Sequence, residues 1–385
     1  MRMPHSMAWA ALIRSPVERA RLLAAARTVT VAASGADAKG ERDLLLARAF
    51  AHPRDARIRF VEDVHKYFLD GAQLPLSVTG LYTQYFEEFD ADAVLRINFA
   101  RWQRADSSNQ KYFRMLAACG ELGIPEAVQK SAIKLAWKLN GERQSGLGTA
   151  LHRVIELTLN EEIIPPYGGK EEDDDDDSDS SGDENDDPRD IILAELTGAT
   201  FNLSEESAGV VMAHLQQEPL VGEGGREVAP LRTDVCEYQY FLNWWEDNAH
   251  LTPIRTEWSL WCSDLQLAGQ LDCLMLDLTT GAFVLVDWKR SKVMEKTAFR
   301  DRRGSPPCDG VVDTNYGHYL IQQNIYAGML SRHYGVEVAR MVLLQLHPDQ
   351  EGYVEHEVPF MRDVTAAIFE QRLADVAKAA AIVEG

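Results

Sequence analysis

Two carboxylates and an amine lie close together in the segment 266–292, QLAGQLDCLMLDLTTGAFVLVDWKRSK. Two apolar runs flank the turn-like stretch 279–281, a pattern that predicts a β-hairpin with Asp272 on the first strand and Asp287 on the second. Successive side chains of a strand alternate between its faces, so Asp287 and Lys289 point the same way. A carboxylate beside an amine, with a second carboxylate on the partner strand, could bind a divalent metal and support phosphodiester hydrolysis.

The strand that ends at Asp287 is apolar on both faces through Val284, Leu285 and Val286. Such a run is typical of a strand buried in a covered sheet. Charged residues at its end therefore require an explanation. One explanation is a salt bridge between Asp287 and Lys289, and the other is a catalytic site.

Two helical patterns carry further polar pairs. His152 and Glu156 are spaced i,i+4 on one face of a helix that begins near Gly148, and imidazole and carboxylate are both metal ligands. Downstream, Gln322 and Tyr326 have the same spacing in another helical pattern. Each pair alone is also compatible with an ordinary structural role.

Together these groups resemble the PD-(D/E)XK nuclease superfamily, and within it the RecB-like branch. The motifs of that branch are a helical His/Glu pair, a G-x-x-D strand, a D/E-x-K strand and a Q-x-x-x-Y helix. They occur here in that order, as His152 with Glu156, Gly269 with Asp272, Asp287 with Lys289, and Gln322 with Tyr326. The resemblance covers roughly residues 146–347 and implies an α/β fold with a restriction-endonuclease-like core, a mixed central sheet flanked by helices.

The resemblance assigns roles to these residues. Mg²⁺ prefers oxygen ligands, so Asp272 and Asp287 are the expected carboxylate ligands, joined by the backbone carbonyl of Trp288. His152 adds a nitrogen ligand, which favours use of Mn²⁺ as well as Mg²⁺. Glu156 is expected to bind a second metal, directly or through water.

Lys289 is expected to orient the attacking water, and a depressed pKa would let it act as a general base. The resemblance gives Gln322 and Tyr326 contacts with the DNA backbone or with water. Glu257, on the strand before the hairpin, is either a further carboxylate of the site or a charge at a strand end, and both interpretations stay open.

Charge is segregated along the chain. The net charge is −21, but residues 171–187 hold twelve acidic and no basic side chains, whereas residues 95–153 carry ten basic and four acidic ones. A basic segment in an acidic protein is typical of a nucleic-acid surface, although a solvated face is the alternative. The side chains expected to contact DNA are Lys130, Lys134, Lys138, Arg143, Arg153, Arg290 and Lys292.

The patterns divide the chain into four parts: 1–56, an N-terminal helical leader; 57–145, a hairpin around Asp70-Gly71 followed by a basic helical region; 146–347, the nuclease core; and 348–385, a strand and a helix. An insertion at 161–252 interrupts the core and is expected to fold as a unit of its own. It contains a disordered acidic loop at 170–188. Four aromatic residues at helical spacing are expected in the core of the helical region, with base stacking as the alternative: Phe99, Trp102, Phe113 and Trp137.

Within the core, strands are expected at 254–262 and 338–346 and a helix at 317–334. The part that follows the core is expected to form an edge strand at 353–359 and a helix at 362–383.

Five scattered cysteines without a C-x-x-C pair indicate buried thiols in a reducing compartment. Because no cysteine follows Cys308, no iron–sulfur cluster of the kind found in some RecB-like nucleases is expected. No apolar run approaches the roughly 18 residues of a membrane span, so no membrane partner is expected. The nucleus or the cytoplasm is the expected location. The first forty residues, rich in Ala and Arg, also fit an organelle presequence, which leaves the mitochondrial matrix open, but a frayed helical leader is the simpler interpretation.

The sequence thus predicts a Mg²⁺- or Mn²⁺-dependent DNA nuclease, an exonuclease or an enzyme that processes DNA ends in replication, repair or recombination. A helicase or another replication or repair protein would supply unwinding, since no P-loop is present. Two alternatives stay open, a catalytically silent DNA-binding or scaffold protein of the same fold and a viral or mobile-element endonuclease.

Overall fold

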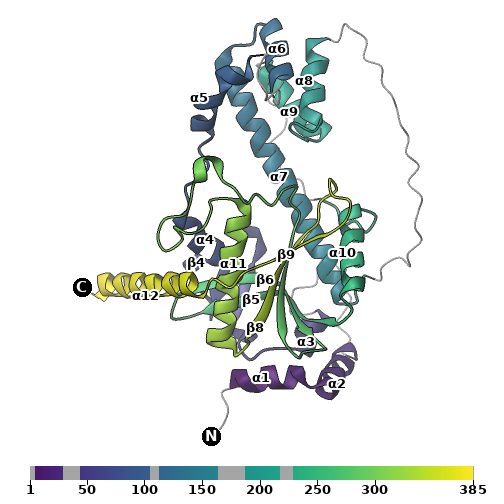
Figure 1. Ribbon diagram of the computed structural model, residues 1–385, viewed down its shortest axis with the longest axis vertical. Helices are drawn as coiled ribbons and strands as arrows, with labels where there is room; N and C mark the ends of the chain where they lie inside the picture. Colours follow the sequence, from purple (N-terminus) through teal and green to yellow (C-terminus); the bar gives the residue numbers. More distant parts are fainter. Residues whose placement is uncertain (1–4, 29–43, 105–111, 164–186, 217–228, 385) are drawn as a thin grey trace. The chain divides into compact units, whose positions relative to one another are not determined.

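The computed structural model describes residues 5–28, 44–104, 112–163, 187–216 and 229–384 (Figure 1). These residues form two compact units. The first, the sheet unit, comprises the described parts of Met1–Glu87, Leu151–Pro165 and Leu231–Gly385. The second, the helical unit, comprises those of Glu88–Ala150 and Pro166–Pro230.

A mixed sheet organises the sheet unit. Its strands are β4 (Leu76–Ser77), β5 (Leu251–Cys262), β6 (Leu267–Asp277), β7 (Phe283–Lys289), β8 (Val338–Gln345) and β9 (Val354–Glu357). They lie in the order β4-β6-β7-β8-β9, and β5 also pairs with β6. The β5–β6, β6–β7 and β8–β9 pairs are antiparallel, whereas β4–β6 and β7–β8 are parallel. The predicted hairpin and the predicted strands around it are confirmed.

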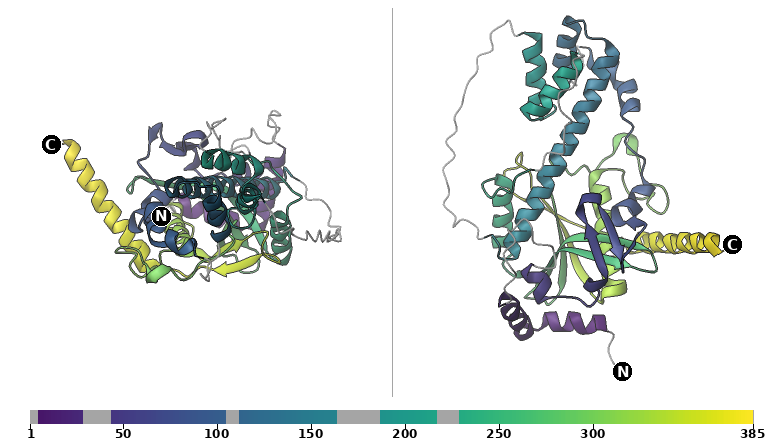
Figure 2. Two further views of the ribbon diagram at one scale, coloured as in Figure 1. Left: turned by 90° about the horizontal axis from the view of Figure 1, so that it is seen from above. Right: turned by 180° about the vertical axis from the view of Figure 1, so that it is seen from behind.

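Helices flank this sheet (Figure 2). They are α1 (His5–Arg14), α2 (Pro16–Arg27), α3 (Leu45–Ala49), α4 (Val78–Tyr82), the C-terminal part of α7 (Glu126–Leu159), α10 (Cys236–Asp247), α11 (Asn315–Met329) and α12 (Arg362–Glu384). Helix α11 begins where the Thr314 hydroxyl accepts a hydrogen bond from the Gly317 amide, and packs on β5, β7 and β8. It continues as a π-helical turn, Leu330–Tyr334, which ends at Gly335 with a φ of 63°.

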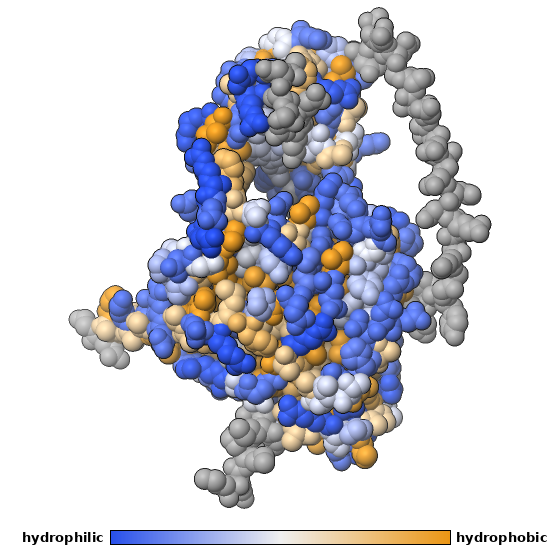
Figure 3. Space-filling view, viewed as in Figure 1, coloured by the Kyte–Doolittle hydropathy of each residue, from blue (hydrophilic) through white to orange (hydrophobic). Residues whose placement is uncertain are grey.

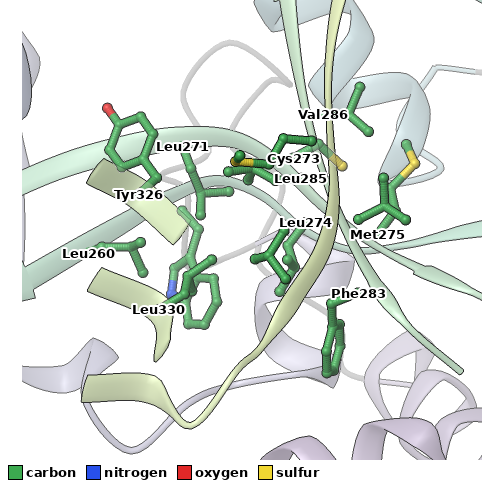
Figure 4. Packing of buried hydrophobic residues seen from close by; sticks show 14 of the residues in the cluster. Leu260, Leu271, Cys273, Leu274, Met275, Phe283, Leu285, Val286, Tyr326 and Leu330 are labelled. Carbon is green, nitrogen blue, oxygen red and sulfur yellow. The ribbon is translucent and has the colours of Figure 1, made fainter. Parts of the chain in front are cut away.

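The strands are apolar because both faces of the sheet are covered. Every residue of β7 except Lys289 is buried, as expected for a central strand with helices on both sides. Leu271, Leu274 and Phe283 lie in the packed cluster shown in Figure 4. Polar and charged side chains dominate the face drawn in Figure 3, with apolar ones between them.

The N-terminal helices belong to the core of the sheet unit. Trp9 and Ile13 of α1 and Leu45 of α3 are buried, and the Trp9 ring lies 5.5 Å from that of Trp258 and 6.5 Å from that of Phe283. The predicted helices are present, but the expectation of a frayed leader is wrong for the described residues. Helix α1, HSMAWAALIR, is largely apolar, so burial of its side chains against the sheet stabilises its docking.

The predicted N-terminal hairpin is part of a small three-stranded sheet, β1 (Ile58–Val61), β2 (Lys66–Leu69) and β3 (Ala72–Gln73). Asp70 and Gly71 turn the chain between β2 and β3 with φ values of 51° and 87°, in the left-handed region that glycine adopts readily. Helix α4 follows, capped by the Ser77 hydroxyl, which accepts a hydrogen bond from the Gly80 amide.

The helical unit contains α5 (Ala91–Trp102), α6 (Phe113–Glu121), the N-terminal part of α7, α8 (Pro188–Thr197) and α9 (Glu205–Leu215). Of the four predicted core aromatics, Phe99 and Trp102 are buried, and Phe113 and Trp137 are half-buried. The structure divides the chain differently from the predicted domains. Helices α8 and α9 of the insertion pack with the preceding helical region, whereas α10 packs in the sheet unit. The predicted disordered acidic loop lies outside the described residues, except for its last residues from Asp187.

A buried ion pair connects β5 to the N-terminal part of the sheet unit. The Arg255 guanidinium, almost completely buried, lies 2.6 Å from Asp55, which also accepts a hydrogen bond of 2.9 Å from the Trp258 indole. Asp55→Ala should therefore destabilise the protein by about 3–5 kcal/mol, because it leaves a buried guanidinium without its carboxylate. Thermal unfolding measures the effect. Asp70→Ala, which breaks the exposed pair with Arg57, is the matched control and should change stability little.

Candidate active site

Three carboxylates lie side by side across three neighbouring strands. In the β5–β6 pairing, Thr256 lies opposite Cys273 and Trp258 opposite Leu271, so Glu257 faces Asp272. In the β6–β7 pairing, Cys273 lies opposite Val286, so the next pair is Asp272 and Asp287. Directly opposed residues of antiparallel strands share a face of the sheet. The row Glu257, Asp272, Asp287 therefore brings three negative charges together.

His152 of α7 contacts this row. Its Nε2 atom donates a hydrogen bond of 2.9 Å to the backbone carbonyl of Trp288. Its Nδ1 atom lies 3.3 Å from Glu257 and 3.6 Å from Asp272. The imidazole thus bridges all three strands. The Trp288 carbonyl, predicted as a metal ligand, is within reach of the site and is bonded to His152 here.

Lys289 lies at the Asp287 end of the row. Its ammonium is 2.7 Å from Asp287 and 4.9 Å from the ring centre of Tyr319 on α11. The Trp288 amide between them donates a 3.0 Å hydrogen bond to Asp272, which ties β7 to β6 at the site. Asp287 and Lys289 thus point to one face and Trp288 to the other, as the strand alternation predicts.

The electrostatics of the site follow from burial and from the crowding of carboxylates. Burial, assisted by the charge of Asp272 and opposed by the hydrogen bond from His152, raises the pKa of Glu257 to about 8. Burial and the charge of Asp272 raise the pKa of Asp287 to about 6. Burial alone would lower the pKa of His152, but Asp272 and Glu257 raise it to about 9. The row of carboxylates is therefore a strong attractor for cations, protons included.

Lys289 differs from the prediction. Burial would lower the pKa of Lys289, but the nearby carboxylates of Asp287 and Asp272 outweigh burial and raise it. The expected depressed pKa is therefore wrong for this structure, and Lys289 carries a proton at neutral pH. A charged ammonium is suited to donate hydrogen bonds to water or phosphate and is unsuited to accept a proton.

Glu156 and the α11 residues lie next to the row. Glu156 is buried and pairs with Arg153 at 2.5 Å, and burial raises its pKa. Tyr326 is buried close enough to Asp272 and Asp287 for their charges to add to burial in raising its pKa. Gln322 is half-buried and makes no hydrogen bond to another described residue. The structure therefore places Tyr326 beside the row, and the roles of Tyr326 and Gln322 stay predictions.

The glycine of the G-x-x-D motif has a packing role. A Cβ atom on Gly269 would lie 2.6 Å from Val78 of α4 and 2.8 Å from the Tyr326 ring. Gly269→Ala should therefore push α4 and α11 away from β6, destabilising the protein by about 1–3 kcal/mol and lowering cleavage. Thermal unfolding and a cleavage assay measure both effects. Gly141→Ala in α7, where nothing lies within 4 Å, is the control and should be neutral or stabilising.

The donor set fits a hard divalent cation. One ligand atom from each of His152, Glu257 and Asp272 lies within 4.8 Å of the others. Apart from the ion pair with Lys289, neither buried carboxylate oxygen of Asp287 accepts a hydrogen bond from a described residue. Oxygen atoms in this state are satisfied by a metal ion, and a carboxylate-rich set with one imidazole suits Mg²⁺ or Mn²⁺. His152, Glu257, Asp272 and Asp287 are thus the residues that would hold it.

Glu257 is the group that sequence patterns left undecided. Its backbone has a φ of 43°, a left-handed conformation that is rare inside a strand and that is often found at functional sites. The position opposite Asp272 depends on how β5 pairs with β6 across the short turn at 263–266, which contains no glycine or proline to identify its type.

The basic side chains predicted to contact DNA differ in how strongly they are bound to other groups of the protein. On α7, Lys130 pairs with Glu126, Lys134 lies 2.7 Å from Asp92 and Lys138 lies 3.8 Å from Glu142. These exposed pairs are weak and compatible with exchange for phosphates. Arg143 contacts Asn202, Arg153 is engaged with Glu156, and Lys292 lies 2.5 Å from Asp349.

Arg290 is the exception among these residues. Its side chain is only 9 % exposed and is bonded to Glu237 at 2.8 Å. Its predicted DNA contact is therefore contradicted, because a buried, paired guanidinium does not reach a phosphate without breaking a core interaction.

The fold and the site define a nuclease core of the restriction-endonuclease type. Residues 128–385 match the sequence model of the PD-(D/E)XK nuclease superfamily. The chain belongs to this superfamily, and the matched region contains every motif residue discussed above. Among curated proteins, no match is found. Within the described residues, no helix is both long and apolar enough to cross a membrane.

Metal affinity should rise steeply with pH. In the metal-free protein, protons occupy the site below the raised pKa values of Asp287, about 6, Glu257, about 8, and His152, about 9. A metal must displace these protons, so affinity for a divalent cation should increase between pH 6 and 9 by up to about tenfold per pH unit for each proton released. Calorimetric titration of Ca²⁺ measures this, and a flat profile would contradict it. Glu257→Gln should reduce the slope below about pH 8, where the Glu257 carboxyl of the metal-free protein carries the proton that a metal displaces.

Proposed function

We propose that this protein is a metal-dependent deoxyribonuclease of the RecB-like branch of its superfamily. The observation that carries the proposal is the row Glu257, Asp272 and Asp287 with His152 on one side and Lys289 on the other. The order of the motifs supports the RecB-like assignment, as does the placement of Tyr326 of the Q-x-x-x-Y helix against Gly269.

A bound Mg²⁺ or Mn²⁺ would supply Lewis-acid chemistry, activating a water and stabilising charge on the phosphate. Asp272 and Asp287, on adjacent strands, would hold the metal ion, and the hydrogen bond from the Trp288 amide fixes the Asp272 carboxylate. His152 bridges the Trp288 carbonyl and Glu257 and so fixes the distance between β5 and β7. Glu156 lies next to the row of three carboxylates and is held by its ion pair with Arg153.

Lys289 is the cationic group of the site. It is held by Asp287 and lies against Tyr319, so its ammonium has few orientations available. Charged, it donates hydrogen bonds to the attacking water and to a phosphate oxygen. Its positive charge is then placed where negative charge develops during hydrolysis. We assign water orientation and charge stabilisation to Lys289, and no general-base role.

The biological role that we propose is exonucleolytic or end-processing cleavage in replication, repair or recombination. Unwinding would come from a partner such as a helicase, because the chain has no P-loop motif. The intact Asp-x-Lys pair favours an active enzyme over a silent scaffold, since loss of either residue would remove the chemistry.

A cleavage assay on four substrates tests the proposal. The substrates are end-labelled linear and closed circular DNA, each single-stranded and duplex, incubated with Mg²⁺ or with Mn²⁺. We expect metal-dependent cleavage of linear DNA and no loss of circles. Cleavage of circles would favour the endonuclease alternative. Absence of cleavage on all four substrates, with the folded protein and both metals, would favour the scaffold alternative.

A further inference from the structure

The loop between β7 and α11 starts directly after Lys289 and is firmly held (Figure 1). Met294 is buried, and Asn315 at the start of α11 accepts a hydrogen bond from the Glu295 amide and donates one to the Val293 carbonyl. Further along, the Ser305 amide donates to the Tyr85 carbonyl at 2.6 Å. The loop therefore has a defined conformation at both ends.

Between these anchors, the loop exposes an aromatic ring. Phe299 is 71 % exposed, and the guanidinium of Arg300 lies 5.1 Å from its ring centre. Arg300 and Asp301 have φ values of 58° and 53°, a conformation that is costly for residues other than glycine. An exposed aromatic ring that contributes nothing to a core, on a strained and anchored turn, is a feature of a binding surface.

A chain of contacts connects this ring to the active site. Lys289 lies against Tyr319, and Tyr316 is one helical turn before Tyr319 on α11. The Lys296 ammonium lies 5.2 Å from the ring centre of Tyr316. Lys296 is three residues before Phe299, and three extended residues span at most about 11 Å. The distance from Phe299 to the row of Glu257, Asp272 and Asp287 is therefore no more than the length of a few nucleotides.

The charge of the loop suits a nucleic-acid strand. Residues 291–303 carry five basic and two acidic side chains in a protein of net charge −21. Three of the basic side chains are paired with carboxylates, Lys292 with Asp349, Arg302 with Asp313 and Arg303 with Asp301. In the part of the chain that the structure describes, Lys296 and Arg300 contact aromatic rings but no carboxylate. These two cations are the ones available for phosphates.

We propose that an unpaired stretch of the DNA strand being cleaved binds to a surface formed by Lys296, Phe299 and Arg300. We call this surface the Phe299 platform. A base stacks on Phe299, and Arg300 and Lys296 bind the flanking phosphates. Stacking on an aromatic side chain is insensitive to base identity but requires a base that is not paired in a duplex. The platform thus gives the enzyme a preference for single-stranded DNA or frayed ends. This inference rests on the proposed nuclease function.

The test measures stacking directly. Single-stranded DNA with 2-aminopurine at successive positions is titrated with Asp287→Asn protein, which is expected to bind without cleaving. We expect quenching of one position by stacking on Phe299. Phe299→Ala in the same background should abolish that quenching and weaken single-strand binding about tenfold, whereas Phe299→Trp should retain both. Blunt duplex binding should be unchanged in both variants.

Phe360→Ala is the matched control. Phe360 is also exposed, at 39 %, with the guanidinium of Arg362 at 5.0 Å from its ring centre, but it lines a cavity against the other end of α11. It should behave as the parent protein. Equal single-strand binding and quenching in Phe299→Ala and the parent would overturn the platform, even if the wild-type enzyme cleaves DNA. Lack of cleavage by the wild-type enzyme would instead count against the proposed function, and the quenching experiment reports on binding in either case.

Discussion

Asp287→Asn should abolish cleavage, by about a thousandfold or more, while the protein stays folded. The substitution keeps the shape of a buried side chain but removes the charge that would hold a divalent cation at the centre of the carboxylate row. Loss of about 4 kcal/mol of transition-state stabilisation corresponds to this factor. Single-turnover cleavage measures the rate, and Ca²⁺ titration should show weakened metal binding.

Asp264→Asn is the control for Asp287→Asn. Asp264 is also an acid of the sheet unit and also has basic partners, the Arg332 guanidinium at 2.7 Å and the His333 imidazole at 2.9 Å. It does not belong to the carboxylate row, so cleavage should persist. Wild-type cleavage by Asp287→Asn, with metal binding intact, would contradict the site assignment.

Lys289→Gln should lower the cleavage rate by about a hundred- to a thousandfold, the range seen when one charged or polar donor to a developing negative charge is removed. Metal binding should be retained or strengthened, because the substitution removes a positive charge 2.7 Å from Asp287. This combination distinguishes the Lys289→Gln variant from the Asp287→Asn variant, which should lose both cleavage and metal binding. Cleavage rates and Ca²⁺ titration together test it.

The metal-free Lys289→Gln protein should also be less stable, because Asp287 loses its ion-pair partner in a buried position. Addition of a divalent cation should restore the melting temperature, since the cation replaces the ammonium as counter-charge. Lys66→Gln, at an exposed lysine of β2 in the same unit, is the control and should change neither rate nor stability much. A Lys289→Gln enzyme that cleaves as fast as Lys66→Gln would remove Lys289 from the mechanism.

Local patterns predicted the parts of the site that local geometry determines. The turn at 279–281 sets the register of β6 on β7, and that register alone places Asp272 opposite Asp287. The i,i+4 spacing likewise placed His152 and Glu156 on one face of α7. A short turn, residues 263–266, also joins β5 to β6, but it contains no glycine or proline from which its type could be predicted, so the role of Glu257 stayed undecided.

Charge state and long-range docking were beyond the reach of such patterns. The pKa of Lys289 depends on how burial is balanced by the charges of two carboxylates. Both effects are set by the folded structure and not by the neighbouring residues in the sequence. Arg290 and Lys292 look equivalent in the sequence, yet one is buried against Glu237 and the other lies at the surface. The docking of α1 depends on Trp9 meeting Trp258 and Phe283, partners far away in the chain.

The position of Trp9 has a consequence for biosynthesis. Its partner Phe283 leaves the ribosome 274 residues later, which takes about 14–55 s at typical rates of synthesis. During this time the apolar side of α1 lacks the strands that bury it in the folded protein, whereas the helical unit, which ends at Pro230, is already synthesised. The apolar surface of α1 is therefore exposed in the nascent chain after the helical unit has been synthesised. We expect chaperones to bind the nascent chain mainly at this N-terminal helix.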